Sequence, residues 1–383
     1  MNAKTVRARD EEDWPPQPRT NPDLIGQVEA ERTLLDAFHG ERMAHAWLIS
    51  GPKGIGKATL AHRFARYVLS QGANEDSRVD NGPGLFADDL QESDPGGLWT
   101  DPGSALFQRV IAGGHADLMC IERSLNKQGK LRSEIVIDDV RTIGGFMSLT
   151  AGEGGWRVVI IDSADEMNRN AANAVLKILE EPPARALLVL ISHNPGRLLP
   201  TIRSRCRNLV LSGLEDPDLQ ILVEKYLTST GAGDRSELVK LAGGSIGRAV
   251  ELSEAGGLAL YRDVLGLLGS CPNLDVPELH KLAGAWARAG AEDTFATAMD
   301  ILLGVLSRLI REFAANRGGK GLASGEVEIF QRLSATVDLD RWLKVWEKIN
   351  MLLDRTDAIN LDRKQVVLNI FLEIEGAARS GQR

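Results

Sequence analysis

The sequence predicts an α/β domain built on a parallel sheet, followed by a helical region. Three short apolar runs indicate the sheet: residues 46–50 (AWLIS), 157–163 (RVVIIDS) and 186–192 (ALLVLIS). Continuous apolar runs with β-branched residues are typical of strands that are buried on both faces, as in parallel sheets. Helical segments lie between the runs, and this alternation requires crossover helices. From about Pro217 onward the pattern changes to one amphipathic helix after another.

Size and composition indicate a folded protein of several domains. The chain has 383 residues, of which 43% are hydrophobic and 26% are charged, and its net charge is −8. These values exclude a collagenous, mucin-like or largely disordered chain, and the length predicts two or three domains because one core rarely organises so many residues. The acidic balance argues against a protein that coats nucleic acid over its whole surface, since such binders carry a basic surplus.

A reducing cytoplasm is the setting that the sequence predicts. Cys120, Cys206 and Cys271 lie at wide spacings without a C-x-x-C pair, which favours neither a disulfide framework nor a zinc site. Residues 1–20 have charges and prolines but no apolar signal-peptide core, so we expect a flexible tail there. No run reaches the roughly 18 apolar residues of a membrane helix, and no membrane partner is expected.

Helical periodicity follows the first two apolar runs and dominates the C-terminal part. The helix after the second run should begin near Asn168, a good N-cap residue, and stop before Pro182. A stretch at about residues 71–105 is rich in Gly, Pro and Asp, and we expect a solvated insertion without chemistry there. Amphipathic stretches at 219–227, 294–313 and 366–374 predict helices that pack in a bundle or against a partner.

A phosphate-binding loop is the strongest local motif. Gly51, Gly56 and Lys57 fit the pattern G-x-x-x-x-G-K, and Gly54 adds flexibility between them. Glycines let the backbone approach a phosphate closely, the following helix offers free N–H groups, and the lysine reaches the terminal phosphates. The motif lies between a predicted strand and a predicted helix, a context that favours a P-loop over a glycine turn without function.

Two positions that nucleotide hydrolysis requires are altered. The residue after the P-loop lysine normally supplies a hydroxyl to Mg²⁺, but here it is Ala58, and the side chain of Thr59 should point about 100° away. Asp162 ends the second predicted strand as a Walker-B aspartate would, but the next position, a glutamate in hydrolytic members of this class, is Ser163. A serine is no general base at neutral pH. Asp165 is expected in the following turn, near a helix start that favours carboxylates.

Two arginines are candidates for contact with phosphates. Arg205 belongs to an arginine-rich stretch, residues 197–211: either it lies on a solvated basic turn beside a buried Cys206, or it enters a neighbouring subunit's site as an arginine finger. Arg248 lies near a predicted helix start. Either Ser245 caps that helix and Arg248 is simply exposed, or Arg248 is a nucleotide sensor that reaches the phosphates.

Taken together, the motifs resemble the AAA+ clamp-loader subunits of bacterial DNA polymerase III, and within that family the delta-prime branch. The resemblance covers about residues 20–375, and the words LEEPP and TIRSRC are particularly typical of the family. The segments that carry it are DLIGQVEAE (23–31), HAWLISGPKGIGKATLA (45–61), IIDSADEMNRNAANAVLKILEEPP (160–183), SHNPGRLLPTIRSRC (192–206), GGSIGRAVEL (243–252) and NLDRKQVVLNIFLEI (360–374).

The resemblance implies a flexible tail followed by three domains. These would be an AAA+ P-loop domain (21–213, with the insertion at about 71–105), a small helical lid domain (214–256) and an all-helical collar domain (257–383). The collar of such subunits assembles with four other subunits into a ring-like pentamer. That complex uses ATP to open the sliding clamp and place it on primer–template DNA, as part of the DNA polymerase III holoenzyme in the nucleoid-associated replisome.

The resemblance also implies partners and roles. Delta-prime subunits commonly do not hydrolyse ATP, and the S-R-C arginine, here Arg205, acts in trans on an adjacent ATPase subunit. The implied partners are the gamma/tau and delta subunits, with the clamp and DNA reached through the complex. Many members carry a four-cysteine zinc module, but this chain has only Cys120 in that part, so we expect no zinc.

Two hypotheses remain open from the sequence. The first is a clamp-loader subunit that does not hydrolyse ATP, with ATP or ADP in the P-loop as an open possibility because Lys57 is retained. The second is an active AAA+ ATPase, such as the loader's motor subunit or a branch-migration helicase. The second requires some other group to replace the missing metal ligand and base.

Overall fold

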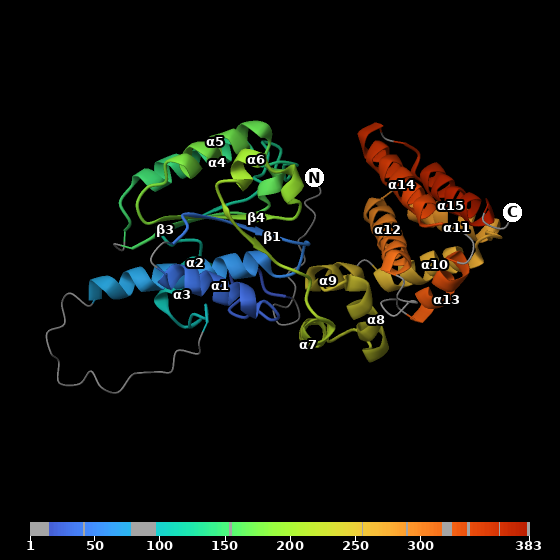
Figure 1. Cartoon of the computed structure of the whole chain (residues 1–383), viewed down its shortest axis with the longest axis horizontal. Helices are drawn as coiled ribbons and strands as arrows, with labels where there is room; N and C mark the ends of the chain where they lie inside the picture. Colours follow the sequence, from blue (N-terminus) through green and yellow to red (C-terminus); the bar gives the residue numbers. More distant parts are fainter. Residues whose placement is uncertain are drawn as a thin grey trace. The chain divides into compact units, whose positions relative to one another are not determined.

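A parallel sheet organises the N-terminal part of the chain in the computed structural model (Figure 1). The structure describes residues 15–40, 43–77, 97–152, 155–254, 256–288, 290–315, 324–334, 338–359 and 361–380. The chain divides into an N-terminal unit, Met1–Tyr226 with Gly244–Gly247, and a C-terminal unit, Leu227–Gly243 with Arg248–Arg383. Among the described helices, none has the length and apolar character that crossing a membrane requires.

Over the described residues, the sheet has five strands in the order β2-β3-β4-β1-β5, and every neighbouring pair is parallel. The strands are β1 (Ala46–Ser50), β2 (Leu118–Ile121), β3 (Arg157–Ile161), β4 (Ala186–Ser192) and β5 (Arg207–Val210). The three predicted strands are the central ones, β3, β4 and β1, in which every residue is buried. The α/β class with a parallel sheet is therefore confirmed.

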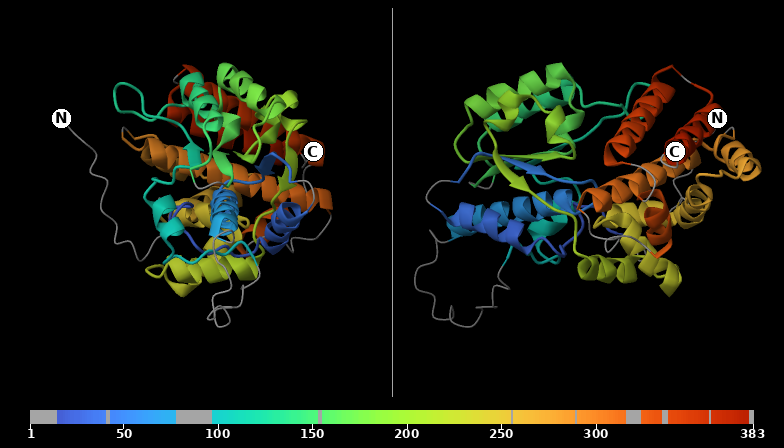
Figure 2. Two further views of the ribbon diagram at one scale, coloured as in Figure 1. Left: turned by 90° about the vertical axis from the view of Figure 1, so that its left-hand side faces the viewer. Right: turned by 45° about the vertical axis from the view of Figure 1, so that its right-hand side comes forward.

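Helices cover both faces of this sheet (Figures 1 and 2). The helices of this unit are α1 (Val28–His39), α2 (Lys57–Ser77), α3 (Ala105–Ile111), α4 (Ile137–Ser148), α5 (Arg169–Glu180), α6 (Pro200–Arg203) and α7 (Asp216–Tyr226). Apolar residues of α1, α2 and α3 form one core with the sheet. Those of α4, α5 and α6 form a second core on the opposite face. Side chains alternate between the two cores along each strand, as the pleat requires.

The ends of α5 agree with the prediction. The side chain of Asn168 accepts a hydrogen bond from the backbone N–H of Ala171 and caps the helix, and the helix ends at Glu180, before Pro182. Helix α2 continues to Ser77, and the insertion at about residues 71–105 stays a prediction. The rest of the insertion falls partly on residues 78–96, which lie outside the described residues, as do residues 1–14 of the proposed tail.

The elements of the C-terminal unit, within its described residues, are all helices. Its helices are α8 (Ala232–Ala242), most of α9 (Ile246–Glu254), α10 (Gly257–Ser270), α11 (Val276–Trp286), α12 (Glu292–Ala315), α13 (Ser324–Ser334), α14 (Leu339–Ile359) and α15 (Arg363–Ser380). The predicted amphipathic stretches lie in α7, α12 and α15. The helical C-terminal region is therefore confirmed, whereas the boundaries of separate lid and collar domains stay a prediction.

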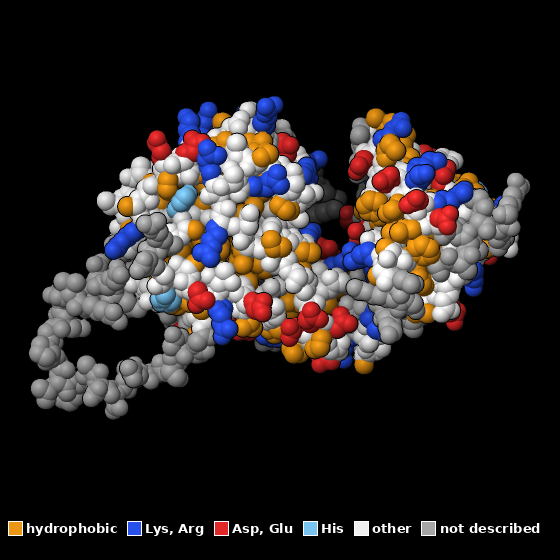
Figure 3. All heavy atoms as spheres, viewed as in Figure 1, with side chains coloured by type: hydrophobic (Ala, Val, Ile, Leu, Met, Phe, Trp, Pro, Cys, Tyr) orange, Lys and Arg blue, Asp and Glu red, His pale blue; other side chains and the backbone are white. Residues whose placement is uncertain are grey.

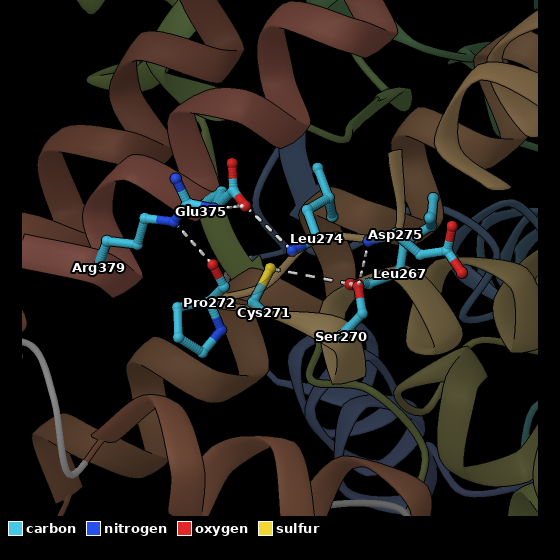
Figure 4. A network of polar contacts seen from close by, with 8 residues as sticks. All are labelled: Leu267, Ser270, Cys271, Pro272, Leu274, Asp275, Glu375 and Arg379. Atoms are coloured by element: carbon cyan, nitrogen blue, oxygen red, sulfur yellow. Dashed lines mark hydrogen bonds and ion pairs between the residues drawn. The ribbon is translucent and has the colours of Figure 1, made fainter. Parts of the chain in front are cut away.

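A polar network fixes α15 to the turn between α10 and α11 (Figure 4). Oε1 of Glu375 accepts hydrogen bonds from the backbone N–H of Leu274 at 3.0 Å and from Nη2 of Arg379 at 2.7 Å. Nε of Arg379 donates to the carbonyl oxygen of Pro272 at 2.9 Å. Glu375 is only 7% exposed, so these bonds satisfy a carboxylate that would otherwise be buried at high cost.

Candidate functional site

The glycine-rich loop between β1 and α2 has the backbone that a phosphate cradle needs. Gly51, Gly54 and Gly56 have φ values of 146°, 76° and 95°, a region that side chains other than glycine rarely adopt. A Cβ atom at Gly51 would lie 2.3 Å from the carbonyl oxygen of Leu211, and one at Gly54 would lie 2.5 Å from Oγ of Ser245. Gly51 and Gly54 are thus required both by backbone conformation and by space, and Gly56 by its backbone conformation.

The beginning of α9 lies against this loop, within the N-terminal unit. Oγ of Ser245 donates to the carbonyl oxygen of Lys53 at 2.8 Å, and the N–H of Gly247 donates to the carbonyl oxygen of Gly54 at 3.1 Å. The hydroxyl that the sequence suggested as a helix cap therefore binds the backbone of the P-loop. Nε2 of Gln27 lies 3.3 Å from the carbonyl oxygen of Ile55 and donates to it. The loop is fixed from two sides.

Lys57 begins α2 and points back at the loop. Its Nζ donates to the carbonyl oxygens of Gly51, at 2.7 Å, and Pro52, and the residue is 3% exposed. Burial lowers the pKa of Lys57 to about 8, although the charges of Asp162 and Asp165 oppose this shift. Because burial disfavours the ammonium ion, an anionic phosphate would be a favourable partner for it.

The residue directly after Lys57 has no side-chain oxygen to offer a metal ion. Ala58 is half-buried and packs against the core formed with α1, α2 and α3. Thr59, one position further around the helix, is 8% exposed. Mg²⁺ prefers oxygen ligands in a near-octahedral arrangement, and the alanine methyl group supplies none.

Asp162 follows β3 directly, and its backbone N–H donates to the carbonyl oxygen of Ile121 at 2.8 Å. The pKa of its carboxyl group is raised, first by burial and then by the charge of Glu122. Because Asp162 also interacts electrostatically with Lys57, the structure brings these two predicted residues together. The negative charge of Asp162 complements the positive charge of Lys57. Because residue 58 has no hydroxyl, the usual set of Mg²⁺ ligands is incomplete.

The neighbouring groups at the ends of β3 and β4 form a network that the sequence did not reveal. Oγ of Ser163 lies 3.2 Å from Nε2 of His193. The carboxylate of Asp165 accepts from the backbone N–H groups of His193 and Asn194, both at 3.0 Å. Asp165 lies in the predicted turn, a 3₁₀ segment (Ala164–Glu166), but it binds the end of β4 and not the start of α5. The only feature of the sequence that could have indicated this network is that both segments follow predicted parallel strands, whose ends meet at one edge of the sheet.

The basic segment after β4 places Arg205 near the end of α5. Nη2 of Arg205 lies 2.8 Å from Oε1 of Glu180, and Arg205 is 36% exposed in its side chain. Cys206 is buried against the core formed with α4, α5 and α6, as the first interpretation of this segment expected. Lys and Arg side chains are visible on the surface of this unit in Figure 3. Independently of that view, the side chains of Arg203 and Lys177 are exposed.

Arg248 follows the P-loop contacts along α9 but belongs to the C-terminal unit. There its Nη2 lies 3.0 Å from Oδ2 of Asp300 in α12. A carboxylate partner orients the guanidinium through a charge-assisted contact. Its role as a nucleotide sensor stays a prediction.

The residues present fit the phosphates of a nucleotide better than they fit its metal ion. Left-handed glycines and a buried lysine suit ATP or ADP, while residues 58 and 163 supply neither a metal ligand nor a strong base. In the described part of the chain, no cluster of three His, Cys, Asp or Glu side chains could hold a metal ion. Cys120, Cys206 and Cys271 are free thiols.

Comparisons with known proteins agree with these features. Residues 86–215 match the family model described as DNA polymerase III, delta subunit. The delta-prime subunit of DNA polymerase III from Pseudomonas aeruginosa is 36% identical over 205 residues, which are 53% of this chain and 53% of that protein. The tau subunit from Salmonella typhimurium is 26% identical over 242 residues, 62% of this chain and 33% of that protein. The predicted resemblance to delta-prime subunits of DNA polymerase III is thereby confirmed as a sequence similarity.

The matches cover only part of these relatives. The chain spans about half of the length of the delta-prime subunit, 53%, and a third of the tau subunit, 33%. Among solved structures, a DNA polymerase III gamma-subunit-related protein from Thermotoga maritima matches with a TM-score of 0.37 and 20% identity, over 91% of this chain and 99% of that one.

Proposed function

We propose that this chain acts as a delta-prime-type subunit of the clamp loader in the DNA polymerase III holoenzyme. In this role it supports ATP-driven loading of the sliding clamp onto primed DNA without hydrolysing ATP itself. One observation carries the proposal: the phosphate cradle around Lys57 is complete, whereas Ala58 and Ser163 stand where hydrolysis needs a metal ligand and a general base. Similarity to delta-prime and tau subunits supports the assignment to a loader.

The contribution of the chain to hydrolysis is then made in a neighbouring site. Arg205 supplies its guanidinium in trans to the nucleotide of an adjacent gamma/tau subunit, where it neutralises charge in the transition state. Gly51, Gly54, Gly56, Lys57 and Asp162 form a site that ATP or ADP can occupy, and Arg248 senses that nucleotide. The helical C-terminal region serves assembly with the gamma/tau and delta subunits.

Two variants of the assembled loader separate this function from the alternative of an active AAA+ ATPase. Lys57→Ala should leave DNA-stimulated ATPase activity and clamp loading nearly unchanged, because this P-loop does no chemistry. Arg205→Ala should reduce both, with Arg203→Ala as a control from the same exposed segment. Loss of an arginine finger costs ~10³–10⁵ in rate in other systems, and a smaller effect is expected where several sites share the work. Loss of activity in Lys57→Ala would favour the alternative.

Partner capture tests the assignment to a loader independently of the chemistry. The full-length chain should co-purify with the gamma/tau and delta subunits of its own cell. DNA contact is expected only through the assembled complex, since the chain has a net charge of −8 and loaders track duplex backbone through phosphate contacts. Failure to co-purify with either subunit would contradict the proposal.

A further inference from the structure

The C-terminal end of α5 holds the side chain of Arg205. Oε1 of Glu180 lies 2.8 Å from Nη2 of Arg205, and Nη1 of the same guanidinium donates to the carbonyl oxygen of Thr201 at 3.1 Å. Glu180 is the last residue of α5, and Thr201 belongs to α6. Two acceptors from two elements therefore engage the two terminal nitrogens of one arginine.

The backbone under this side chain is also fixed. The N–H of Arg205 donates to the carbonyl oxygen of Ile202 at 3.1 Å. Ile202 is fully buried and Cys206 is 8% exposed, so the residues before and after the arginine are anchored in one core. The remaining freedom of Arg205 lies in its side-chain torsions, which would otherwise cost roughly 2 kcal/mol of rotamer entropy to order.

The solvent exposure of the Glu180–Arg205 ion pair determines how strongly the pair holds the guanidinium. The side chains of Arg205 and Glu180 are 36% and 50% exposed, and ion pairs that are so open to solvent are weak. Such a pair orients a guanidinium but cannot withhold it from a phosphate, which binds arginine through strong charge-assisted hydrogen bonds. A guanidinium has five N–H donors, so two contacts leave donors for an incoming anion.

We infer that Glu180 is a positioning residue for Arg205. Together with the carbonyl oxygen of Thr201, its carboxylate holds the guanidinium in an orientation from which it is presented to the terminal phosphate oxygens of a nucleotide on another subunit. This inference rests on the proposed function of Arg205 as a finger in trans. It adds a residue that never touches the nucleotide but sets the geometry of the residue that does.

The test uses the reconstituted loader with Glu180→Gln, which removes the charge and preserves the shape of the side chain. Glu181→Gln is the matched control, because Glu181 is the adjacent exposed carboxylate. Glu180→Gln should lower kcat for DNA-stimulated ATP hydrolysis by roughly 2- to 5-fold, the range that an exposed pair supports. KM for ATP should stay unchanged, because the finger acts in the transition state. Glu181→Gln should match wild type.

A double variant distinguishes positioning from a structural role. Glu180→Gln combined with Arg205→Ala should be no slower than Arg205→Ala alone, since Glu180 acts only through Arg205. Three outcomes would overturn the inference if Arg205→Ala by itself lowers kcat. These are a further loss of kcat in the double variant, a wild-type kcat for Glu180→Gln, and a rise in kcat for Glu180→Gln. An unaffected Arg205→Ala would instead overturn the proposed function on which it rests.

A conservative variant covers the case in which Glu180→Gln does not assemble. Glu180→Asp retains the charge on a shorter side chain and should give a kcat between those of wild type and Arg205→Ala, with assembly and thermal unfolding like wild type. A kcat for Glu180→Asp that equals that of wild type under these conditions would overturn the inference.

Discussion

Oγ of Ser163 lies 3.2 Å from Nε2 of His193, at the ends of two adjacent parallel strands. Ser163 occupies the position next to Asp162 where a hydrolytic site needs a carboxylate to activate water. The pKa of His193 is lowered, first by burial and then by the charge of Lys57, so its imidazole is a weaker base than a free one. The local chemistry is therefore suited to polar contact with a phosphate and poorly suited to splitting it.

Nucleotide affinity should depend on pH through Lys57. Its pKa is lowered to about 8, and a bound phosphate favours the ammonium ion, so binding must take up a proton once the pH exceeds that value. ADP affinity measured by calorimetry without Mg²⁺ should therefore fall about tenfold from pH 7 to pH 9, as expected for one group with that pKa. Lys57→Met should bind weakly with a flat profile, and a flat profile for wild type would contradict the role of Lys57.

Gly54→Ala should destabilise the N-terminal unit. Gly54 has φ of 76°, and an added Cβ would lie 2.9 Å from the Cα of Gly247, which is backbone and cannot move aside alone. We expect a loss of about 1–3 kcal/mol in the free energy of unfolding. Gly144→Ala is the matched control, because Gly144 lies within α4 with nothing within 4 Å and should be neutral or stabilising. Equal denaturant midpoints for both variants would refute the prediction.

Asp165→Asn should weaken the connection between β3 and β4. Each carboxylate oxygen of Asp165 accepts one backbone N–H, from His193 and from Asn194, and an amide can accept only one of them. Because Asp165 is 9% exposed, the loss should be about 1–3 kcal/mol in urea unfolding. Asp138→Asn is the control, since its side chain is 83% exposed. A wild-type midpoint for Asp165→Asn would show that these bonds contribute little.

Glu375→Gln should destabilise the C-terminal unit. One oxygen of Glu375 accepts from both Leu274 and Arg379, and the amide weakens the charge-assisted bond to the arginine. A loss of roughly 1–2 kcal/mol in unfolding is expected. Glu373→Gln provides the comparison, because Glu373 is 45% exposed and pairs only at the surface with Lys348. Similar losses for both variants would contradict the importance of the network in Figure 4.

The central part of the fold was predictable, and its edges were not. The three predicted strands are buried along their whole length, so their apolar runs are continuous. The two missed strands are the outer ones: β5 exposes three of its four residues, and β2 has only its last residue buried. An edge strand obtains its hydrogen bonds from one neighbour and leaves little pattern in four residues.

The site was predictable where local sequence determines it. The P-loop glycines and Lys57 follow from backbone and phosphate chemistry within seven consecutive residues. The contact between Ser245 and Lys53 spans 192 positions, and that between Ser163 and His193 spans 30. Such contacts depend on how strand ends and helix starts meet in space, for which one sequence contains no local signal.

Steady-state ATP turnover by the purified, isolated chain tests whether this P-loop can hydrolyse a nucleotide. No turnover above that of a mock preparation is expected, because Ala58 and Ser163 leave the pocket without a metal ligand and a base. Turnover of about one per second, an ordinary enzymatic rate, that disappears in Lys57→Ala would contradict this expectation.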